Sequence, residues 1–343
     1  MKRLPLALLI LAACSRPVAV TTGAAAPLSA EERTRQLLFT LADDSMEGRG
    51  VGTRGSARAA RYIAEQMQAA GLTPAGDSGY FQRVPIAMVA RGSQETLRPT
   101  LMPSFTAMDT IPTARRLNGV NVAGIIRGSD AALASEAILV DAHYDHVGIR
   151  APVNGDSIYN GADDDASGTV AVLEIARAIA AGPRPKRTIV FVATTGEETG
   201  LLGTRWYISH PVVPLEQTVA NLEIEMIGRP DSLAGGAGRG WLTGYERSTM
   251  GEMFAAAGLP IVADKRLDQQ FFMRSDNIAF ARRGIVAHTL SSFNMHTDYH
   301  QPSDEASKAD VAHMTRLIDA AARAVRLLAD GTKPVWKEGG RPQ

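Results

Sequence analysis

The chain has 343 residues, of which 45% are apolar, and its 36 basic residues balance 36 acidic ones. A chain of this length and composition can bury one large core, or one core with a small appendage. The zero net charge disfavours nucleic acid and other polyanions as partners.

Residues 1–13 are predicted to be a signal peptide. They combine a charged start, Lys2 and Arg3, with an apolar segment, 4–11, that is too short to span a bilayer. The sequence Leu11-Ala12-Ala13-Cys14 then resembles a bacterial lipobox, where the chain is cut before a cysteine that becomes lipidated. An ordinary signal peptide that contains a cysteine is the alternative.

Residues 14–30 are rich in Pro, Ala, Thr and Ser and are interpreted as a flexible tether. Ser15, directly after the cysteine, favours the outer membrane over the inner one. We therefore expect an exported lipoprotein of the cell envelope that faces the periplasm and contacts the membrane only through lipidated Cys14. Because Cys14 is the only cysteine, the fold has no internal disulfide.

The next part of the chain predicts two helices followed by short strands and loops. Helical periodicity covers residues 31–41 and 55–70, and a glycine-rich loop, 44–50, lies between them. Residues 80–125 mix β-branched residues with Pro and Gly, which indicates short strands and loops.

From residue 136 onward, short apolar runs alternate with helical patterns. The runs that predict buried strands are 138–140, 189–192 and 285–286. The segments that predict helices are 167–180, 201–209, 248–257 and 308–328. This alternation predicts an α/β fold with a mixed, largely parallel central sheet flanked by helices. We expect one domain over residues 31–332 and a disordered tail over 333–343.

Acidic residues and histidines gather where the predicted strands end. His143 follows one strand, Glu197 and Glu198 follow the next, and three consecutive aspartates, 163–165, precede a predicted helix. Carboxylates that close to a core are costly unless a cation neutralises them. Because ligands of such folds gather at the carboxyl ends of the strands, the pattern predicts one metal site. The spacing indicates two metal ions.

Four motifs in this order resemble those of the two-zinc exopeptidases that include the secreted bacterial leucyl aminopeptidases. They are Ala142-His143-Tyr144-Asp145, Gly161-Ala162-Asp163-Asp164-Asp165-Ala166-Ser167-Gly168, Thr195-Gly196-Glu197-Glu198-Thr199-Gly200-Leu201-Leu202-Gly203, and Asp298-Tyr299-His300. The resemblance covers residues 37–328. It implies a zinc metallopeptidase with the three-layer α/β/α fold that glutamate carboxypeptidases and glutaminyl cyclases share.

The resemblance also implies the metal ligands. Asp164 would bridge two zinc ions, one of which would add Glu198 and His300, and the other His143 and Glu225. Three carboxylates and a bridging hydroxide neutralise two Zn²⁺ ions, as a partly buried site needs.

Two of these ligands have an alternative. His296 stands close to His300 in the sequence, and Glu223 lies on the same face of a strand as Glu225, which replaces the aspartate of many relatives. The remaining histidines have no partner motif and are expected to be structural or exposed; they are His146, His210, His288 and His313.

Three further residues are expected to act in catalysis. Glu197 is the expected general base, which takes a proton from the attacking water and gives it to the leaving amine. Asp145 is expected to orient His143 through the far ring nitrogen. Tyr299 is expected to donate a hydrogen bond to the oxyanion, with core packing as the alternative.

The sequence thus predicts an aminopeptidase that hydrolyses N-terminal residues from peptides with water activated by two zinc ions. A carboxypeptidase or dipeptidase of the same family is the nearest alternative, and it would need arginines to hold a substrate carboxylate. The candidate arginines for this role are Arg229, Arg274, Arg282 and Arg283. Less favoured are a glutaminyl-cyclase-like acyltransferase and a non-catalytic binding lipoprotein.

Overall fold

The computed structural model describes residues 28–90 and 96–343. The predicted signal peptide, the lipobox and nearly all of the predicted tether lie outside these residues. No helix within the described ranges is both long enough and apolar enough to cross a membrane.

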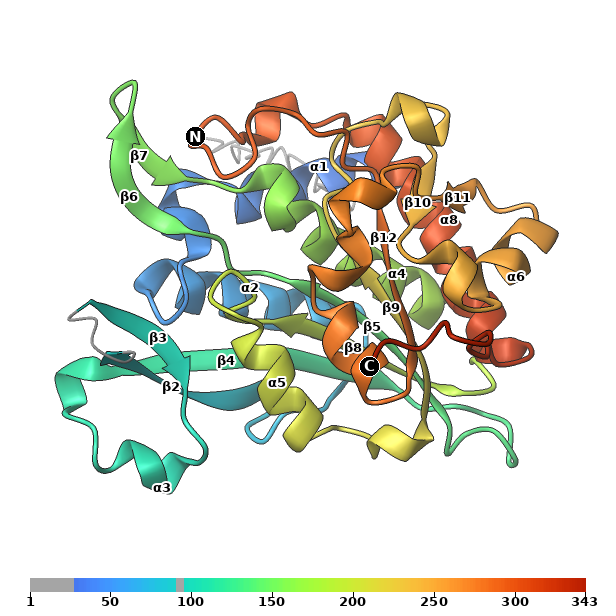
Figure 1. Ribbon diagram of the computed structural model, residues 1–343, viewed down its shortest axis with the longest axis horizontal. Coiled ribbons are helices and arrows are strands. Elements are labelled where there is room, and N and C mark those ends of the chain that lie inside the picture. The colour runs from blue at the N-terminus through green and yellow to red at the C-terminus, as the bar shows by residue number, and fades with distance from the viewer. Residues whose placement is uncertain (1–27, 91–95) are drawn as a thin grey trace, which may run out of the picture.

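A mixed sheet of ten strands forms the centre of the molecule (Figure 1). The strands follow the order β11-β10-β12-β9-β5-β8-β4-β2-β3, and β1 pairs with β4. Their bounds are Thr73–Pro74 (β1), Phe81–Ala90 (β2), Leu97–Leu101 (β3), Arg116–Ile126 (β4), Ala137–His143 (β5), Thr188–Thr194 (β8), Thr218–Ile224 (β9), Gly240–Leu242 (β10), Ile261–Ala263 (β11) and Val286–Ser291 (β12). A separate hairpin, β6 (Gly148–Val153) and β7 (Asp156–Tyr159), projects from the body.

The strands from β12 to β3 fall into a parallel and an antiparallel part, and β10 pairs antiparallel with the outer side of β12. The four central strands β12, β9, β5 and β8 run parallel, whereas β4, β2 and β3 pair antiparallel. This confirms the predicted α/β fold with a mixed sheet. In the parallel part, β5 and β8 contain the predicted runs 138–140 and 189–192, whereas the predicted run 285–286 reaches only the first residue of β12.

The antiparallel half differs from the expectation of short strands and loops. β2 has 10 residues and β4 has 11. The residues that indicated interruptions lie inside the strands: Pro85 pairs with Asn118, and Gly119 leaves the room that the side chain of Ile86 occupies. Proline and glycine are therefore accommodated within these paired strands and do not end them.

Helices cover both faces of the sheet, so the fold has three layers. Ile138 and Val140 of β5 enter a core with α1, α2, α4 and α8, whereas Leu139 enters the opposite core with α5 and α7. This separation follows from the alternation of side chains along a strand. The helix bounds are Ala30–Leu41 (α1), Arg54–Ala69 (α2), Phe105–Met108 (α3), Gly168–Ala181 (α4), Leu202–Ser209 (α5), Met250–Ala256 (α6), Asn277–Arg282 (α7) and Val311–Asp330 (α8).

Helices α4 and α8 pack next to the parallel strands, and their sequences explain the burial of α4 and the start of α8. Asp310 caps α8 by accepting a hydrogen bond from the backbone N–H of His313, which satisfies one of the free donors at a helix start. Every residue of α4 from Gly168 to Ala176 is buried, because this helix packs against the sheet and against α1, α2 and α8.

The predicted disordered tail is wrong. The indole Nε1 of Trp336 donates to the carbonyl of Gly284 at 2.9 Å, and the backbone N–H of Lys337 donates to the carbonyl of Arg247 at 2.9 Å. The ring of Trp336 packs against those of Phe272 and His288. The side chain of Trp336 therefore anchors residues 333–343, although most of the residues around it in the sequence are polar.

Candidate metal centre

The candidate site lies at the carboxyl ends of the parallel strands. His143 is the last residue of β5, and Glu225 directly follows β9. Glu197 and Glu198 lie in the loop after β8, and Asp164 lies in the turn that leads into α4. Parallel strands bring these residues together because all of them end at the same edge of the sheet.

The first group of possible ligands consists of His143, Asp164 and Glu225, whose ligand atoms all lie within 4.8 Å of one another. The Nε2 atom of His143 lies 3.3 Å from Oδ1 of Asp164 and 3.8 Å from Oε1 of Glu225.

The second group consists of His146, Asp164, Glu198 and His300, again within 4.8 Å. The Nε2 atom of His300 lies 3.1 Å from Oδ2 of Asp164 and 3.1 Å from Oε1 of Glu198. Asp164 therefore belongs to both groups, with Oδ1 toward the first and Oδ2 toward the second. A carboxylate that faces two ligand groups in this way can bridge two ions.

The buried polar atoms of these groups fit zinc. Within the described chain, Nε2 of His143, Nε2 of His300 and Oε1 of Glu198 are buried and have no hydrogen-bond partner. Such atoms are costly in a protein interior unless something else binds them. Imidazole nitrogens and carboxylate oxygens are ligands that zinc accepts.

The electrostatics of the site also favour a cation. Burial raises the pKa of the Asp164 carboxyl, but the neighbouring rings of His143 and His300 outweigh burial and hold this pKa well below its ordinary value. Burial lowers the pKa of His300, yet Asp164 and Glu198 raise it to about 9. A zinc ion would compete with the protons that this excess of carboxylates holds.

The structure distinguishes the two pairs of alternatives. Glu223 is fully buried and accepts hydrogen bonds from the hydroxyls of Ser275 and Thr289 and from two backbone N–H groups, so its oxygens are occupied. His296 bonds Asp163 at 2.8 Å. Neither residue belongs to a ligand group, whereas Glu225 and His300 do.

Glu197 lies beside the ligand groups and is the expected general base. Burial raises the pKa of its carboxyl well above the ordinary value, His143 opposes that rise, and Glu225 adds to it. A neighbouring cation would lower this pKa again, so that the carboxylate can accept a proton near neutral pH.

Asp145 acts on His143 differently from the expectation. The Nδ1 atom of His143 contacts the backbone carbonyl of Asp145 at 3.0 Å, whereas the carboxylate is 4.0 Å away. That carboxylate instead accepts a hydrogen bond from the backbone N–H of Glu197 at 3.1 Å. The imidazole is thus oriented by a main-chain group, and the side chain of Asp145 positions the loop that carries Glu197.

Tyr299 lies next to the ligands. Its ring stacks on that of His300, with centroids 4.0 Å apart, and packs against Phe293. No hydrogen bond of its hydroxyl is found among the described residues, which leaves the hydroxyl as a donor. Its role toward an oxyanion stays a prediction.

Two residues of the site were missed in the sequence. His146 is fully buried in the second ligand group, although the sequence indicated a structural or exposed residue; its position three residues after His143 in the same loop was the available signal. Arg49, from the glycine-rich loop, is also fully buried.

Arg49 holds together the loops that carry the ligands. Its guanidinium donates at 2.7 Å to the carbonyls of Leu41, Tyr144, Asn160 and Gly161. Tyr144 lies between His143 and His146, and Gly161 lies just before Asp164. Only an arginine can satisfy four such carbonyls at once, because it carries five N–H donors in a fixed plane.

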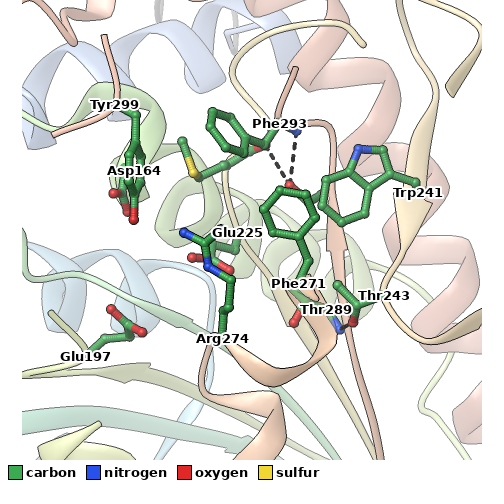
Figure 2. Close-up of a pocket in the computed structure, with 12 residues that line it drawn as sticks. Asp164, Glu197, Glu225, Trp241, Thr243, Phe271, Arg274, Thr289, Phe293 and Tyr299 are labelled. Atoms are coloured by element: carbon green, nitrogen blue, oxygen red, sulfur yellow. Dashed lines mark hydrogen bonds between the residues drawn. The ribbon is translucent and has the colours of Figure 1, made fainter. Parts of the chain in front are cut away.

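A pocket opens beside the first ligand group. Figure 2 shows Asp164, Glu197 and Glu225 on one side of this pocket and the aromatic rings of Trp241 and Phe271 on the other. The other lining residues are Met226, Thr243, Arg274, Thr289, Ser291, Phe293 and Tyr299.

The three-layer fold, the paired ligand groups and the adjoining pocket define this chain as a zinc metallopeptidase. Residues 121–325, more than half of the chain, match the family described as Peptidase family M28, and the chain belongs to that family. This agrees with the predicted resemblance to two-zinc exopeptidases.

Solved structures share the fold at low sequence identity. A zinc aminopeptidase from Bacillus subtilis is similar with a TM-score of 0.63 and 18% identity, over 89% of this chain and 96% of that one. A glutaminyl cyclase from Porphyromonas gingivalis is similar with a TM-score of 0.58 and 15% identity, over 87% and 97%.

Relatives with closer sequences are fungal. The vacuolar membrane protease of Verticillium alfalfae is 29% identical over 198 residues, which are 57% of this chain and 18% of that protein. The protein of the same name from Tuber melanosporum is 27% identical over 231 residues, or 64% and 22%. The chain thus spans about a fifth of the length of these relatives.

Proposed function

We propose that this metallopeptidase is an aminopeptidase that uses two zinc ions. The observation that carries the proposal is the position of Glu197, Asp164 and Glu225 at one pocket with aromatic walls. The aromatic rings can hold the side chain of a terminal residue. The carboxylate of Glu225, which is 24% exposed, can accept hydrogen bonds from a protonated N-terminal amine.

The residues of the site divide the work of hydrolysis. Asp164, His143 and Glu225 would hold one ion, and Asp164, Glu198 and His300 the other. When bound, the ions would lower the pKa of a water molecule and polarise the scissile carbonyl. Glu197 takes the proton of the attacking water and delivers it to the leaving amine. The Tyr299 hydroxyl is the donor for the oxyanion.

Arg274 favours a carboxypeptidase or dipeptidase as a second candidate. It lines the pocket, its guanidinium lies 5.1 Å from the ring of Phe271, and it forms no ion pair within residues 28–90 and 96–343. It can therefore bind a substrate carboxylate. Arg229 cannot do so as readily, since it pairs with Asp298 at 2.8 Å. Arg282 and Arg283 do not line this pocket.

Hydrolysis of a substrate panel tests the proposal. Leucyl, phenylalanyl and glutamyl arylamides should be cleaved, their N-acetylated forms should not, and a chelator should abolish the activity until zinc is restored. Preferred release of the C-terminal residue from N-blocked dipeptides would support the second candidate instead. Activity that is unaffected by thorough removal of metal would refute both.

We also propose, from the sequence alone, that the protein is anchored through Cys14. The substitution Cys14→Ser should abolish incorporation of labelled lipid and move the protein from the membrane to the soluble periplasmic fraction, because residues 4–11 are too short to span a bilayer and no lipid then anchors the chain. Unchanged membrane fractionation of Cys14→Ser would contradict the lipoprotein assignment.

A further inference from the structure

We propose that His146 is a zinc ligand and that the two metal positions are unequal. The group of His146, Asp164, Glu198 and His300 would hold a tightly bound, structural ion. The group of His143, Asp164 and Glu225 would hold a more weakly bound ion that serves catalysis. This inference rests on the proposed two-zinc function.

The surroundings of His146 are those of a ligand. Its Nδ1 atom lies 2.8 Å from Oε1 of Glu198 and 3.8 Å from Oδ2 of Asp164. Its ring meets that of His300 edge to face, with centroids 5.4 Å apart. Neither ring nitrogen of His146 has a hydrogen bond in the described chain, and Oε1 of Glu198 has none either. The two groups are close but lack hydrogen-bond geometry.

Two other buried histidines show what a structural role looks like in this protein. His288 contacts the hydroxyl of Ser248 through Nε2 and the carbonyl of Thr243 through Nδ1, both at 2.7 Å. His313 accepts the N–H of Gly238 at Nδ1 and contacts the hydroxyl of Ser292 at Nε2. Both nitrogens of each ring are satisfied, as is usual for buried polar groups. His146 departs from this pattern.

The number of ligands separates the two positions. The group with His146 offers four protein ligands, the number that is typical of structural zinc sites, whereas the other group offers three, as in catalytic sites. Each additional ligand stabilises the bound ion, so the two positions should differ in affinity.

The residues that line the pocket also distinguish the two metal positions. Its lining includes Asp164 and Glu225 but not the three residues that are specific to the other group, His146, Glu198 and His300. A substrate in the pocket therefore meets the three-ligand position first. The four-ligand group faces the other oxygen of this shared carboxylate, Oδ2, and an ion held there would fix that oxygen.

Zinc titration of the metal-free protein tests the inference, with a chromophoric chelator as competitor. We expect two classes of zinc in the wild-type protein. His146→Ala should weaken the tighter class by roughly 100-fold or more and leave the weaker one, since loss of even an outer-shell partner costs about 10- to 100-fold. Glu225→Gln should weaken only the other class. His296→Gln is the matched control, because this neighbouring histidine belongs to neither group.

Melting temperatures distinguish a ligand from a structural histidine. If His146 is a ligand, His146→Ala should melt earlier than wild type only when zinc is present, because metal stabilises the folded state by binding to it. Equal losses with and without zinc, at unchanged affinities, would overturn the inference. His146→Gln, which preserves polarity and approximate size, serves if His146→Ala does not fold. A wild-type protein that binds two zinc equivalents in a single class would overturn the inequality of the two positions, whereas one that binds a single equivalent, or none, would refute the proposed two-zinc function itself.

Discussion

Glu197→Gln should lower kcat by roughly 10²–10⁴-fold, the usual effect of removing general acid–base assistance. The substitution keeps the size and polarity of the side chain but removes the proton acceptor beside the metal ligands. KM should change little, because the loss falls on the transition state and not on the binding of the substrate. Zinc content and melting temperature should stay near wild type, since Glu197 belongs to neither ligand group. Steady-state kinetics and metal analysis measure these quantities.

The adjacent Glu198→Gln is the matched control. Glu198 contacts His146 and His300 in the four-ligand group, and a neutral amide is a poor substitute for an anionic ligand. This variant should lose zinc and melt earlier in the presence of zinc, unlike Glu197→Gln. If Glu197→Gln loses zinc and Glu198→Gln keeps it, the roles of the two residues are exchanged. Near wild-type turnover of both variants would remove the basis for the proposed mechanism.

Part of the parallel half of the fold could be predicted, because β5 and β8 are nearly continuous apolar runs. Residues 137–142 of β5 and 188–194 of β8 are buried on both faces, and such strands leave a clear signal in the sequence. The antiparallel half gives a weaker signal. Pro85 and Gly119 lie inside β2 and β4, where the pairing of neighbouring strands outweighs local preference.

The site was predictable where a residue type and its place after a strand carried the chemistry. His143 and Glu198 are of this kind. Arg49 was not predictable, because its role depends on four carbonyls from three other parts of the chain. The sequence shows only a charged residue in a loop of glycines. Its complete burial is visible once those loops are placed around it.

His146 and Trp336 illustrate a second limit. The immediate neighbours of each in the sequence give only a weak signal: His146 stands three residues after His143 but lacks a motif of its own, and the neighbours of Trp336 are mostly polar. Their partners lie far along the chain: Glu198 and His300 for His146, and Gly284 for Trp336. Contacts between distant segments decide the role of such residues, and only the assembled fold brings those segments together.

Asp164→Asn should remove most of the zinc, with a larger effect on metal content than any other single substitution at the site. Asp164 is the one residue common to both ligand groups, and its two oxygens face different groups. The change keeps the shape of the side chain but takes one negative charge and one ligand oxygen from the centre. An amide nitrogen cannot ligate zinc, so at most one of the two groups retains a full set of donor atoms.

The two positions should respond to Asp164→Asn to different degrees. The three-ligand group would keep only His143 and Glu225, too few to hold an ion, whereas the other would keep Glu198, His300 and His146. Metal analysis should therefore find about two zinc equivalents in wild type and less than one in Asp164→Asn. The loss of activity should follow the loss of zinc from the three-ligand position. The melting temperature in zinc should fall to that of the metal-free protein or slightly above it. Two retained equivalents would show that Asp164 does not bridge, because only a shared ligand weakens both positions at once.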